Sequence, residues 1–371
     1  MKVAYFIGSL NRGGAEMLTL DICRKRESAP FDMVLIYRNE GELSEVFKET
    51  GVPMLRIKPG KNKLGYFYQI RKALKQEIVD LIHAQTLTNA LISVICTFFS
   101  SIKVVATFHG FYKSAMSKVK RHLVMWSADA LLFVSKYERD WYVRSSFLCP
   151  KNHCHVVYNG LVFDKLDVKH TCPDFLVSSH QNKPECVCLV MVGNFAKGRS
   201  QFFVCKSLKR LVEQGNRGFQ FFFVGKRVDA TPWRYDECVR YCEDHYLTDC
   251  VHFVGSRGDV PAILQHSDGF VYASEHDSFG IAVVEAVASG LPTLVNDWDV
   301  MQEVVGEKGW AEMYRTDDVE DCCSKMRSLI ENIDYRKRLA KQAKREIRHT
   351  YSIETHIDNL YSVYSSLYKK N

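Results

Sequence analysis

The residues best suited to chemistry lie in the segment SEHDSFGIAVVEAVASGLP, residues 274–292. Asp277 falls in a loop after a predicted strand, Gly280 precedes a predicted helix, and Gly290 ends that helix before a proline. Backbone amides at the start of such a helix can hold a phosphate, and the carboxylates of Asp277 and Glu285 can accept hydrogen bonds from sugar and ribose hydroxyls. The contacts to the phosphate are expected from Ser278, Phe279, Gly280, Ile281 and Ala282.

Two loops in the first half of the chain also follow predicted strands, at the edge where open parallel sheets bind ligands. The turn GSLNRGG brings Gly13 and Gly14 to the start of a helix and can accept an anion, although a plain strand-to-helix turn would look the same. Its glycines lack the G-x-G-x-x-G spacing, which disfavours a nicotinamide or flavin enzyme. His109 ends the strand KVVATF and can hydrogen-bond a polar substrate, unless a backbone group satisfies it.

A basic loop, GNFAKGR at residues 193–199, follows a predicted strand in the second half. Lys197 and Arg199 can neutralise phosphate, Arg199 through its forked donors. A solvated loop would have the same composition.

Short β-rich runs alternate with helical patterns from end to end, which predicts an α/β fold with parallel sheets. We expect two Rossmann-like domains, residues 1–166 and 185–351, separated by a polar linker over 167–184 and with a ligand cleft where strand ends face one another. A last helix, residues 352–371, carries an apolar stripe that must pack on something. Strands are predicted at Val3–Ile7, Met33–Tyr37, Met54–Ile57, Leu81–His83, Val104–Phe108, Ala130–Val134 and His155–Val157, then at Val187–Val192, Phe219–Val224, Val251–Phe253, Gly269–Tyr272, Thr293–Val295 and Ala311–Tyr314.

These segments together resemble the retaining glycosyltransferases of family four, within group 1, which have the GT-B fold. The family pattern has an acid, then F-G, and then the motif E-A-x-A-S-G-x-P. The glutamate of that motif stands eight positions after the first acid. In this chain Asp277 is the first acid and Glu285 is the glutamate. The resemblance covers nearly the whole chain and implies that the last helix packs on the first domain. It includes Gly13-Gly14, Thr107 to His109, Tyr158-Asn159-Gly160, Gly193 to Arg199, and Val254-Gly255 followed by Asp259-Val260-Pro261.

The resemblance implies that these residues bind a nucleoside diphosphate sugar. The amide of Gly14 would contact the diphosphate, Arg199 the phosphate, and His109 the transferred sugar. Asp277 would bind the sugar hydroxyls, Glu285 the ribose, and Gly255 and Ser256 would line the base pocket.

Two positions depart from the family pattern. Asp277 replaces the usual glutamate and is one methylene shorter, which bears on the choice of donor. Asn194 replaces an arginine, leaving Arg199, with Lys197 or Arg12, to balance the diphosphate.

The expected reaction is transfer of a hexose-type sugar from a nucleoside diphosphate sugar to a hydroxyl of a glycan or lipid-linked saccharide, in surface polysaccharide biosynthesis. Retention at the anomeric carbon and no metal or other cofactor are expected, with His109, Asp277 and Arg199 as catalytic residues. Asp297 and Asp299 resemble the metal-binding pair of the other major glycosyltransferase fold, but Asp299 is placed to cap the following helix. The alternatives are a GT-B epimerase or phosphorylase, and an inactive subunit that binds nucleotide sugar.

The net charge of the 371-residue chain is +7, which favours an acidic partner without naming one. No segment is long and apolar enough to span a membrane and the start does not read as a signal peptide, so a cytoplasmic location is expected. Basic amphipathic helices at 61–77 and 113–126 can rest on the anionic inner face of a membrane, and would equally suit a solvated face over a core. Their expected apolar faces are Leu64, Phe67, Leu74 and Ile78, and Met116, Val119, Leu123 and Val124.

Two other classes are disfavoured. The basic residues form no aromatic-interleaved motif for nucleic acid. The 13 cysteines are odd in number and scattered, as expected of reduced thiols. The candidate ligands for a zinc site are Cys238, Cys242, His245, Cys250 and His252. They lack the paired Cys-x-x-Cys spacing of structural zinc sites, which disfavours zinc.

Overall fold

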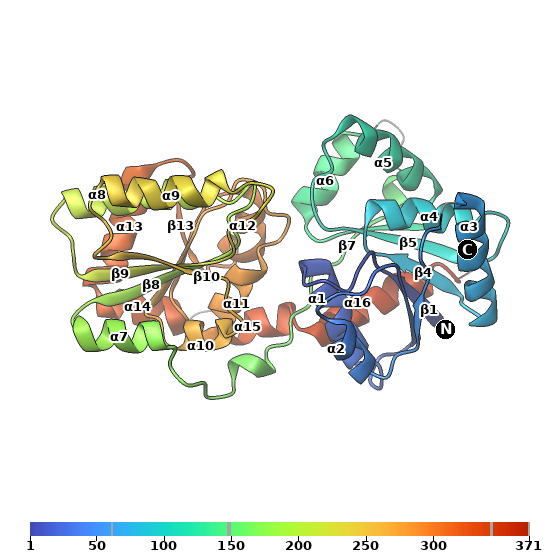
Figure 1. Cartoon of the computed structure of the whole chain (residues 1–371), viewed down its shortest axis with the longest axis horizontal. Coiled ribbons are helices and arrows are strands. Elements are labelled where there is room, and N and C mark those ends of the chain that lie inside the picture. The colour runs from blue at the N-terminus through green and yellow to red at the C-terminus, as the bar shows by residue number, and fades with distance from the viewer. Residues whose placement is uncertain (61, 147–149, 342–343, 370–371) are drawn as a thin grey trace. The chain divides into compact units, whose positions relative to one another are not determined.

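The computed structural model describes residues 1–371 except 61, 147–149, 342–343 and 370–371. The chain forms two compact units (Figure 1): Met1–Val162 with Tyr351–Asn371, and Phe163–Thr350. Each unit is a parallel sheet with helices on its faces, as the alternating pattern predicts. None of the helices in the described ranges has both the length and the apolar character needed to cross a bilayer.

The sheet of the first unit has the order β3-β2-β1-β4-β5-β6-β7, and the strands pair in parallel. This order places β1, β4 and β5 side by side, so the loops after them meet at one edge of the sheet. The elements are β1 Lys2–Phe6, α1 Gly14–Arg24, β2 Asp32–Tyr37, α2 Ser44–Glu49, β3 Met54–Arg56, α3 Lys63–Gln76, β4 Leu81–Ala84, α4 Leu87–Thr97, β5 Lys103–Phe108, α5 Ala115–Ser127, β6 Ala130–Phe133, α6 Lys136–Arg144, the 3₁₀ helix η1 Lys151–His153, β7 Cys154–Val156 and α16 Ile353–Ser366.

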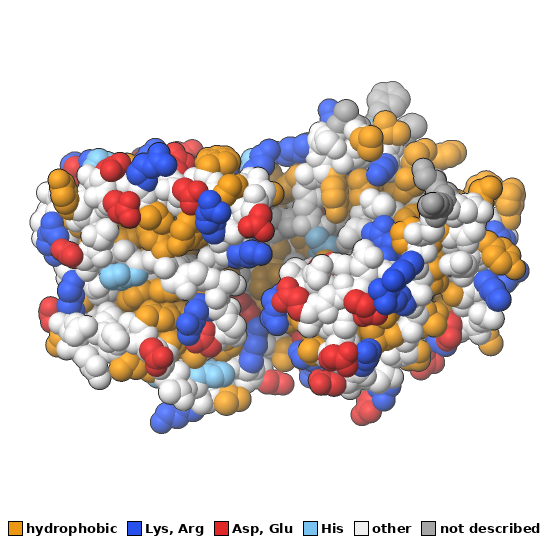
Figure 2. All heavy atoms as spheres, in the orientation of Figure 1, with side chains coloured by type: hydrophobic (Ala, Val, Ile, Leu, Met, Phe, Trp, Pro, Cys, Tyr) orange, Lys and Arg blue, Asp and Glu red, His pale blue; other side chains and the backbone are white. Residues whose placement is uncertain are grey.

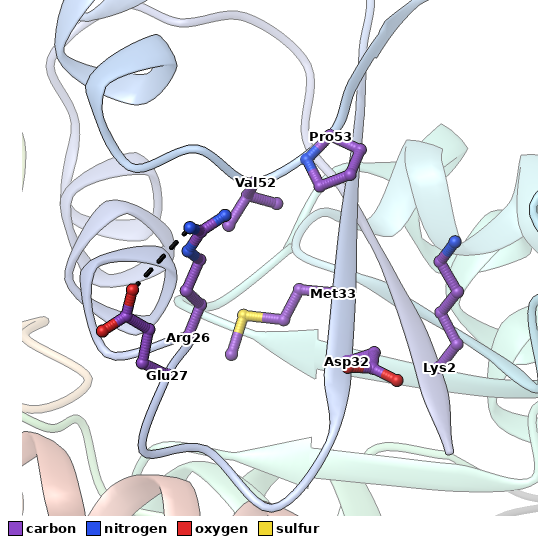
Figure 3. Close-up of a pocket in the computed structure, with 7 residues that line it drawn as sticks. All are labelled: Lys2, Arg26, Glu27, Asp32, Met33, Val52 and Pro53. Carbon is purple, nitrogen blue, oxygen red and sulfur yellow. Dashed lines mark ion pairs between the residues drawn. The ribbon is translucent and has the colours of Figure 1, made fainter.

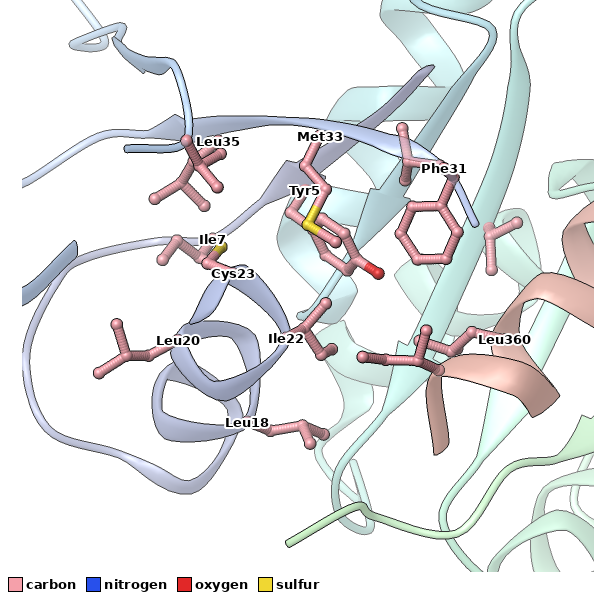
Figure 4. Packing of buried hydrophobic residues seen from close by; sticks show 14 of the residues in the cluster. Tyr5, Ile7, Leu18, Leu20, Ile22, Cys23, Phe31, Met33, Leu35 and Leu360 are labelled. Atoms are coloured by element: carbon pink, nitrogen blue, oxygen red, sulfur yellow. The ribbon is translucent and has the colours of Figure 1, made fainter. Parts of the chain in front are cut away.

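Alternate residues of the first sheet enter two separate cores, because successive side chains of a strand point to opposite faces. Tyr5, Met33 and Leu35 pack against α1 and the last helix α16, which contributes Leu360 (Figure 4). The opposite face packs against α3, α4, α5 and α6. The first unit therefore covers the apolar stripe of α16, although the whole second unit, Phe163–Thr350, lies between α16 and the rest of the first unit in the sequence.

The sheet of the second unit has the order β10-β9-β8-β11-β12-β13, again parallel. β8 and β11 are neighbours at its centre, and the loops after them carry Arg199 and Asp277. The elements are the 3₁₀ helix η2 Asp164–Leu166, α7 Asp174–Asn182, β8 Val187–Val192, α8 Gln201–Glu213, β9 Phe219–Val224, α9 Trp233–Asp244, β10 Val251–Gly255, α10 Val260–Gln265, β11 Gly269–Tyr272, α11 Ile281–Ser289, β12 Thr293–Asn296, α12 Asp299–Met301, the π-helix η3 Gln302–Gly306, β13 Glu312–Tyr314, α13 Val319–Glu331, α14 Ile333–Lys341 and α15 Lys344–Thr350.

All the strands predicted from the sequence are present, and their ends match the prediction or differ from it by at most two residues. The predicted linker over 167–184 is wrong in its character: it contains the helix α7, and the second unit begins at Phe163. Leu176 is buried, and the ring of Phe175 lies 5.0 Å from that of Phe222. The polar composition of this segment led to the prediction of a linker, although Phe175 and Leu176 pack a short helix against the second unit.

The expected apolar face of the basic helix α3 is divided between core and surface. Tyr66, Ile70 and Leu74 are buried at i, i+4 and i+8, whereas Leu64 and Ile78 are 77% and 80% exposed. Ile78 lies beyond the end of the helix, with φ of 52°. Residue 61 of the expected helix lies outside the described residues.

The expected apolar face of the basic helix α5 is also divided between core and surface. Val124 is buried, but Met116, Val119 and Leu123 are exposed. The buried side instead includes Arg121, together with Val124. The exposed residues and the buried residues of α5 both recur at helical spacing, so periodicity alone does not decide which side of the helix faces the sheet.

Candidate active site

The loops after β8 and β11 are joined by backbone hydrogen bonds. The amide of Ser200 donates to the carbonyl of Ala273 at 3.1 Å, and the amide of Glu275 donates to the carbonyl of Gly198 at 3.0 Å. Gly198 has φ of 93°, which favours glycine at this turn. These bonds bring Arg199 onto the loop that carries Asp277.

Arg199, Asp277 and Tyr272 form a three-way contact at this edge of the sheet. Nη1 of Arg199 donates to the Tyr272 hydroxyl and to Oδ2 of Asp277, and the Tyr272 hydroxyl donates to the same carboxylate oxygen. Burial lowers the pKa of Arg199 to about 10, so its guanidinium stays charged at neutral pH. Burial raises the pKa of Asp277, whereas the adjoining guanidinium favours the ionised carboxylate. Tyr272 was not among the residues expected from the sequence.

Buried polar groups hold the turn before Asp277. Asn296 Nδ2 donates to the Ser274 carbonyl at 2.9 Å, and its Oδ1 accepts from the Ser274 amide at 3.0 Å. The Ser274 hydroxyl accepts from the Asp277 amide at 3.2 Å. The position of the Asp277 carboxylate is therefore set by the backbone as well as by Arg199.

The helix α11 begins as the sequence predicts. Gly280 has φ of 88°, and a β-carbon there would lie 2.5 Å from Cε of Met301. The N-cap residue is Gly280, which has no side chain that could cap the helix, so the N-terminus at Ile281 is suited to an anion. Oε1 of Glu285 lies 2.5 Å from Nζ of Lys165, a residue of η2 that sequence reasoning missed.

The other expected donor-binding residues of the second unit lie at the same edge of the sheet. Asn194 is exposed, and its Oδ1 accepts from the Lys226 amide at 2.9 Å. Lys197 is exposed. Gly255 ends β10 with φ of 72° and is followed by the exposed Ser256.

Gly13 and Gly14 lie at the start of α1 in the first unit. Gly13 is the N-cap and has extended backbone, so this turn does not depend on a positive φ. The Glu16 carboxylate packs against Gly13, and burial raises the pKa of that carboxyl. An anion at this helix N-terminus would therefore meet an acidic side chain that sequence reasoning did not consider.

His109 follows β5 in the first unit, and its Nε2 lies 2.8 Å from Oε1 of Gln85, the residue after β4. Burial lowers the pKa of His109 to about 4, so the imidazole is neutral at pH 7. His109 is thus positioned by a side-chain amide.

The residues considered as metal ligands make other contacts in the structure. Among the described residues, no group of three or more His, Cys, Asp or Glu side chains is placed to hold a metal ion. His252 Nε2 lies 2.8 Å from Gln220 Oε1, and His245 packs on the ring of Tyr241. Asp297 accepts from the amide and hydroxyl of Thr316. The expected capping role of Asp299 is wrong, since this residue begins α12 and caps no helix with its side chain.

A surface pocket of about 360 Å³ lies at the opposite edge of the first sheet, where β1 and β2 begin (Figure 3). None of the expected site residues lines it. Its lining is Lys2, Arg26, Glu27, Asp32, Met33, Val52 and Pro53.

The two parallel sheets with helices on their faces fit the two Rossmann-like domains of the GT-B fold, and a cation, acids and a helix N-terminus lie at the carboxyl edge of the second sheet. Residues 12–165 match the family model described as glycosyltransferase family 4, and residues 176–346 match that described as glycosyl transferases group 1. The chain belongs to the group 1 glycosyltransferases with the GT-B fold.

Curated relatives cover most of the chain at low identity. The capsular polysaccharide biosynthesis glycosyltransferase CapH of Staphylococcus aureus is 22% identical over 299 residues, 77% of this chain and 78% of CapH. An Escherichia coli protein named UDP-Gal:alpha-D-GlcNAc-diphosphoundecaprenol alpha-1,3-galactosyltransferase is 22% identical over 303 residues, 76% of each chain.

Solved structures share the fold over the full length. A glycosyltransferase from Rickettsia africae has a TM-score of 0.86 at 17% identity, covering 100% of this chain and 99% of that one. Anabaena HepE in complex with UDP and glucose has a TM-score of 0.83 at 17% identity, covering 99% of this chain and 100% of that one.

Proposed function

We propose that the protein transfers a hexose-type sugar from a nucleoside diphosphate sugar to a hydroxyl of a glycan or lipid-linked saccharide, in surface polysaccharide biosynthesis. The observation that carries this proposal is the convergence of Arg199, Asp277, Glu285 and the uncapped start of α11 at one edge of the second sheet. Two relatives support the proposal. One is named as a capsular polysaccharide biosynthesis glycosyltransferase, and the other is named as a galactosyltransferase that acts on a diphosphoundecaprenol-linked sugar.

The charged residues of this edge would stabilise the leaving diphosphate. Arg199 and the amides from Phe279 to Ala282 would bind the phosphates, and the carboxylate of Asp277 would orient the sugar hydroxyls. Glu285 would accept hydrogen bonds from the ribose. Because Arg199 is paired with Asp277 and Glu285 with Lys165, donor binding would share or exchange these ion pairs.

We propose further that transfer retains the anomeric configuration and needs no metal ion or other cofactor. The carboxylate of Asp277 is held by Arg199 and Tyr272, which makes it a poor nucleophile and favours attack on the face that the leaving group occupies. The positive charge of Arg199 and the amides of α11 would take the place of a metal.

Two alternatives are separated from transfer by their products. A GT-B epimerase or phosphorylase would convert the donor without forming a glycoside with an acceptor hydroxyl. An inactive subunit would bind the nucleotide sugar without turning it over.

Turnover of a panel of nucleotide sugars tests the proposal. We expect the wild type to use at least one donor, and Glu285→Ala to lower kcat/KM roughly 10- to 100-fold, since a hydrogen bond to a charged group is worth about 1.5–3 kcal/mol. Glu312→Ala is the matched control, since Glu312 also pairs with a lysine, Lys325, in the same unit. EDTA is expected to leave the rate unchanged. No turnover and no binding of any donor would contradict the proposal.

An anionic membrane surface is the second proposed partner. On α5, Met116, Val119, Leu123 and Trp126 form a stripe at helical spacing, each between 48% and 71% exposed. Figure 2 shows hydrophobic side chains at the surface of the first unit over α5 and α3. Neither helix contains an acidic residue. An apolar stripe flanked by lysines suits anionic lipid, where each cation near the surface contributes about 1 kcal/mol.

Vesicle sedimentation tests this contact. We expect the protein to bind vesicles containing phosphatidylglycerol more tightly than neutral vesicles, and the Trp126→Ser variant to bind roughly tenfold more weakly. Trp233→Ser is the control, since Trp233 is also exposed but lies in the second unit. Equal binding by both variants, or no preference for anionic lipid, would contradict this assignment.

A further inference from the structure

A line of buried polar side chains crosses the first unit from α16 to His109. The hydroxyls of Tyr5 and Tyr364 lie 3.2 Å apart, and the Tyr364 hydroxyl lies 2.6 Å from Nδ1 of His83. Tyr5 extends from β1 within the core (Figure 4). Nε2 of His83 lies 3.5 Å from Nε2 of Gln85, whose Oε1 lies 2.8 Å from Nε2 of His109. The five side chains thus connect the last helix with the ligand edge of the first sheet.

The donors and acceptors of this line form one consistent set. Since the Gln85 carbonyl oxygen can only accept, His109 carries its proton on Nε2. Since the Gln85 amide nitrogen can only donate, Nε2 of His83 is an acceptor, and it accepts from the Thr107 hydroxyl at 2.6 Å as well. The proton of His83 then lies on Nδ1 and is donated to Tyr364.

Gln85 has little freedom to leave this arrangement. Its side chain is 2% exposed, and its backbone amide donates to the Phe6 carbonyl at 3.1 Å. A buried amide that loses its partners costs about 1–3 kcal/mol. The amide is therefore held against His109 from the adjacent strand.

Both histidines of the line are neutral. Burial lowers the pKa of His109 and of His83; His109 and His356 of α16 lower that of His83 further, and His356 lowers that of His109. Within the described part of the chain, the charged groups that shift these two pKa values are histidines and not carboxylates.

We propose that Gln85 is a positioning residue that holds His109 as the neutral, Nε2-protonated tautomer, and that Tyr364 fixes the same arrangement from behind through His83. His109 then meets the transferred sugar as a neutral hydrogen-bonding group and not as an imidazolium. The effect on transfer rests on the proposed function, but the tautomer is measurable without it.

NMR of protein labelled at histidine tests the tautomer directly. The signals of His109 are assigned by their loss in His109→Gln. We expect the Nε2-protonated form in the wild type, with no titration of His109 above about pH 5. In Gln85→Glu the new carboxylate stabilises the imidazolium, and His109 is expected to titrate between about pH 6 and 8.

The chain offers a matched control in the second unit. Gln220 is 4% exposed, and its Oε1 lies 2.8 Å from Nε2 of His252, the same distance as in the Gln85–His109 pair. Gln220→Glu is expected to shift the titration of His252 and to leave that of His109 unchanged.

Kinetics separate positioning from a purely structural role. We expect Gln85→Leu to lower kcat roughly 10- to 100-fold, with the donor KM changed less than about twofold, because a misplaced group costs chemistry more than binding. Tyr364→Phe, which removes only the hydroxyl, is expected to lower kcat less. Gln85→Glu is expected to make kcat depend on pH between about pH 6 and 8, whereas Gln220→Glu is not.

An Nδ1-protonated His109 in the wild type would overturn the proposal, and this measurement needs no variant that folds poorly. So would a folded Gln85→Glu protein in which His109 titrates as in the wild type. If the wild type turns over no donor, the proposed function fails while the NMR result still decides the tautomer.

Discussion

Replacing Arg199 with alanine is expected to remove nearly all transfer activity and to destabilise the second unit at neutral pH. Losing a preorganised charge at the leaving group costs about 10²- to 10³-fold in kcat. Asp277, whose side chain is 14% exposed, would lose its ionic partner, and an unpaired buried carboxylate costs about 3 kcal/mol. Initial rates and urea unfolding of the full chain measure the two effects.

The double variant Arg199→Ala/Asp277→Asn separates stability from activity. It removes the unpaired charge, so we expect it to recover most of the stability lost in Arg199→Ala while remaining inactive. Arg210→Ala is the control, because Arg210 pairs with Glu320 at the surface, where such pairs contribute at most about 1 kcal/mol. A single variant as stable as the wild type would show that the pair is not buried as described.

The pH dependence of Arg199→Ala has a definite sign. Burial raises the pKa of the Asp277 carboxyl to about 7 with Arg199 beside it. Loss of the guanidinium raises that pKa further, although the Tyr272 hydroxyl still donates to the carboxylate. Between pH 7 and about 4 the folded variant then binds a proton that the unfolded chain does not. We expect its stability deficit against the wild type to shrink as the pH falls from 7 to 5, and a deficit that grows over this range would contradict the assignment.

The second large effect is acid destabilisation of the first unit through His356. His356 is 6% exposed, and its Nδ1 donates to the Tyr158 carbonyl at 2.6 Å. Burial lowers its pKa to about 4, so between about pH 6.5 and 4 the unfolded chain binds the proton and the folded chain does not. The unit is expected to lose up to about 3 kcal/mol over this range, since each pKa unit corresponds to about 1.4 kcal/mol.

The variant His356→Gln tests this source of acid sensitivity. The glutamine amide can still donate to the Tyr158 carbonyl but does not titrate. We expect the variant to lose less stability between pH 7 and 4.5 than the wild type, measured as hydrogen-exchange protection of β1 and β4. His122→Gln on α5 is the control and is expected to keep the wild-type slope. An unchanged slope in His356→Gln would assign the effect to other groups.

Much of the fold was predictable because strands buried on both faces read as continuous apolar runs. VCLVMV at Val187–Val192 is such a run, and its predicted ends match the structure. The helix α7 was missed because its apolar residues, Phe175, Leu176 and Val177, are consecutive and therefore show no helical period. On α5, Val124 was grouped with the exposed residues Met116, Val119 and Leu123, because the buried side of the helix includes Arg121, whose charge gives no apolar signal.

The site was predictable where a single segment contains the residues that start and end its helix. Gly280, with its positive φ, and Gly290 bound α11 as the sequence indicates, and Glu285 lies on that helix. The partners of these residues were not predictable. Tyr272, Lys165 and Gln85 gave no signal, because a buried aromatic, a surface lysine and a glutamine are common residues whose roles depend on what they contact.

The sequence by itself determined the two parallel sheets, the family and the segments that carry the candidate donor site. It did so through local patterns: apolar runs, helix ends, and acids at fixed spacing within one strand, loop and helix. Only the tertiary structure decided that Arg199 is paired with Asp277, Lys165 with Glu285, and His109 with Gln85. Those contacts join residues 78, 120 and 24 positions apart. The order of strands, which no local pattern contains, places β8 beside β11 and β4 beside β5, and the packing of η2 in the second unit places Lys165 against α11.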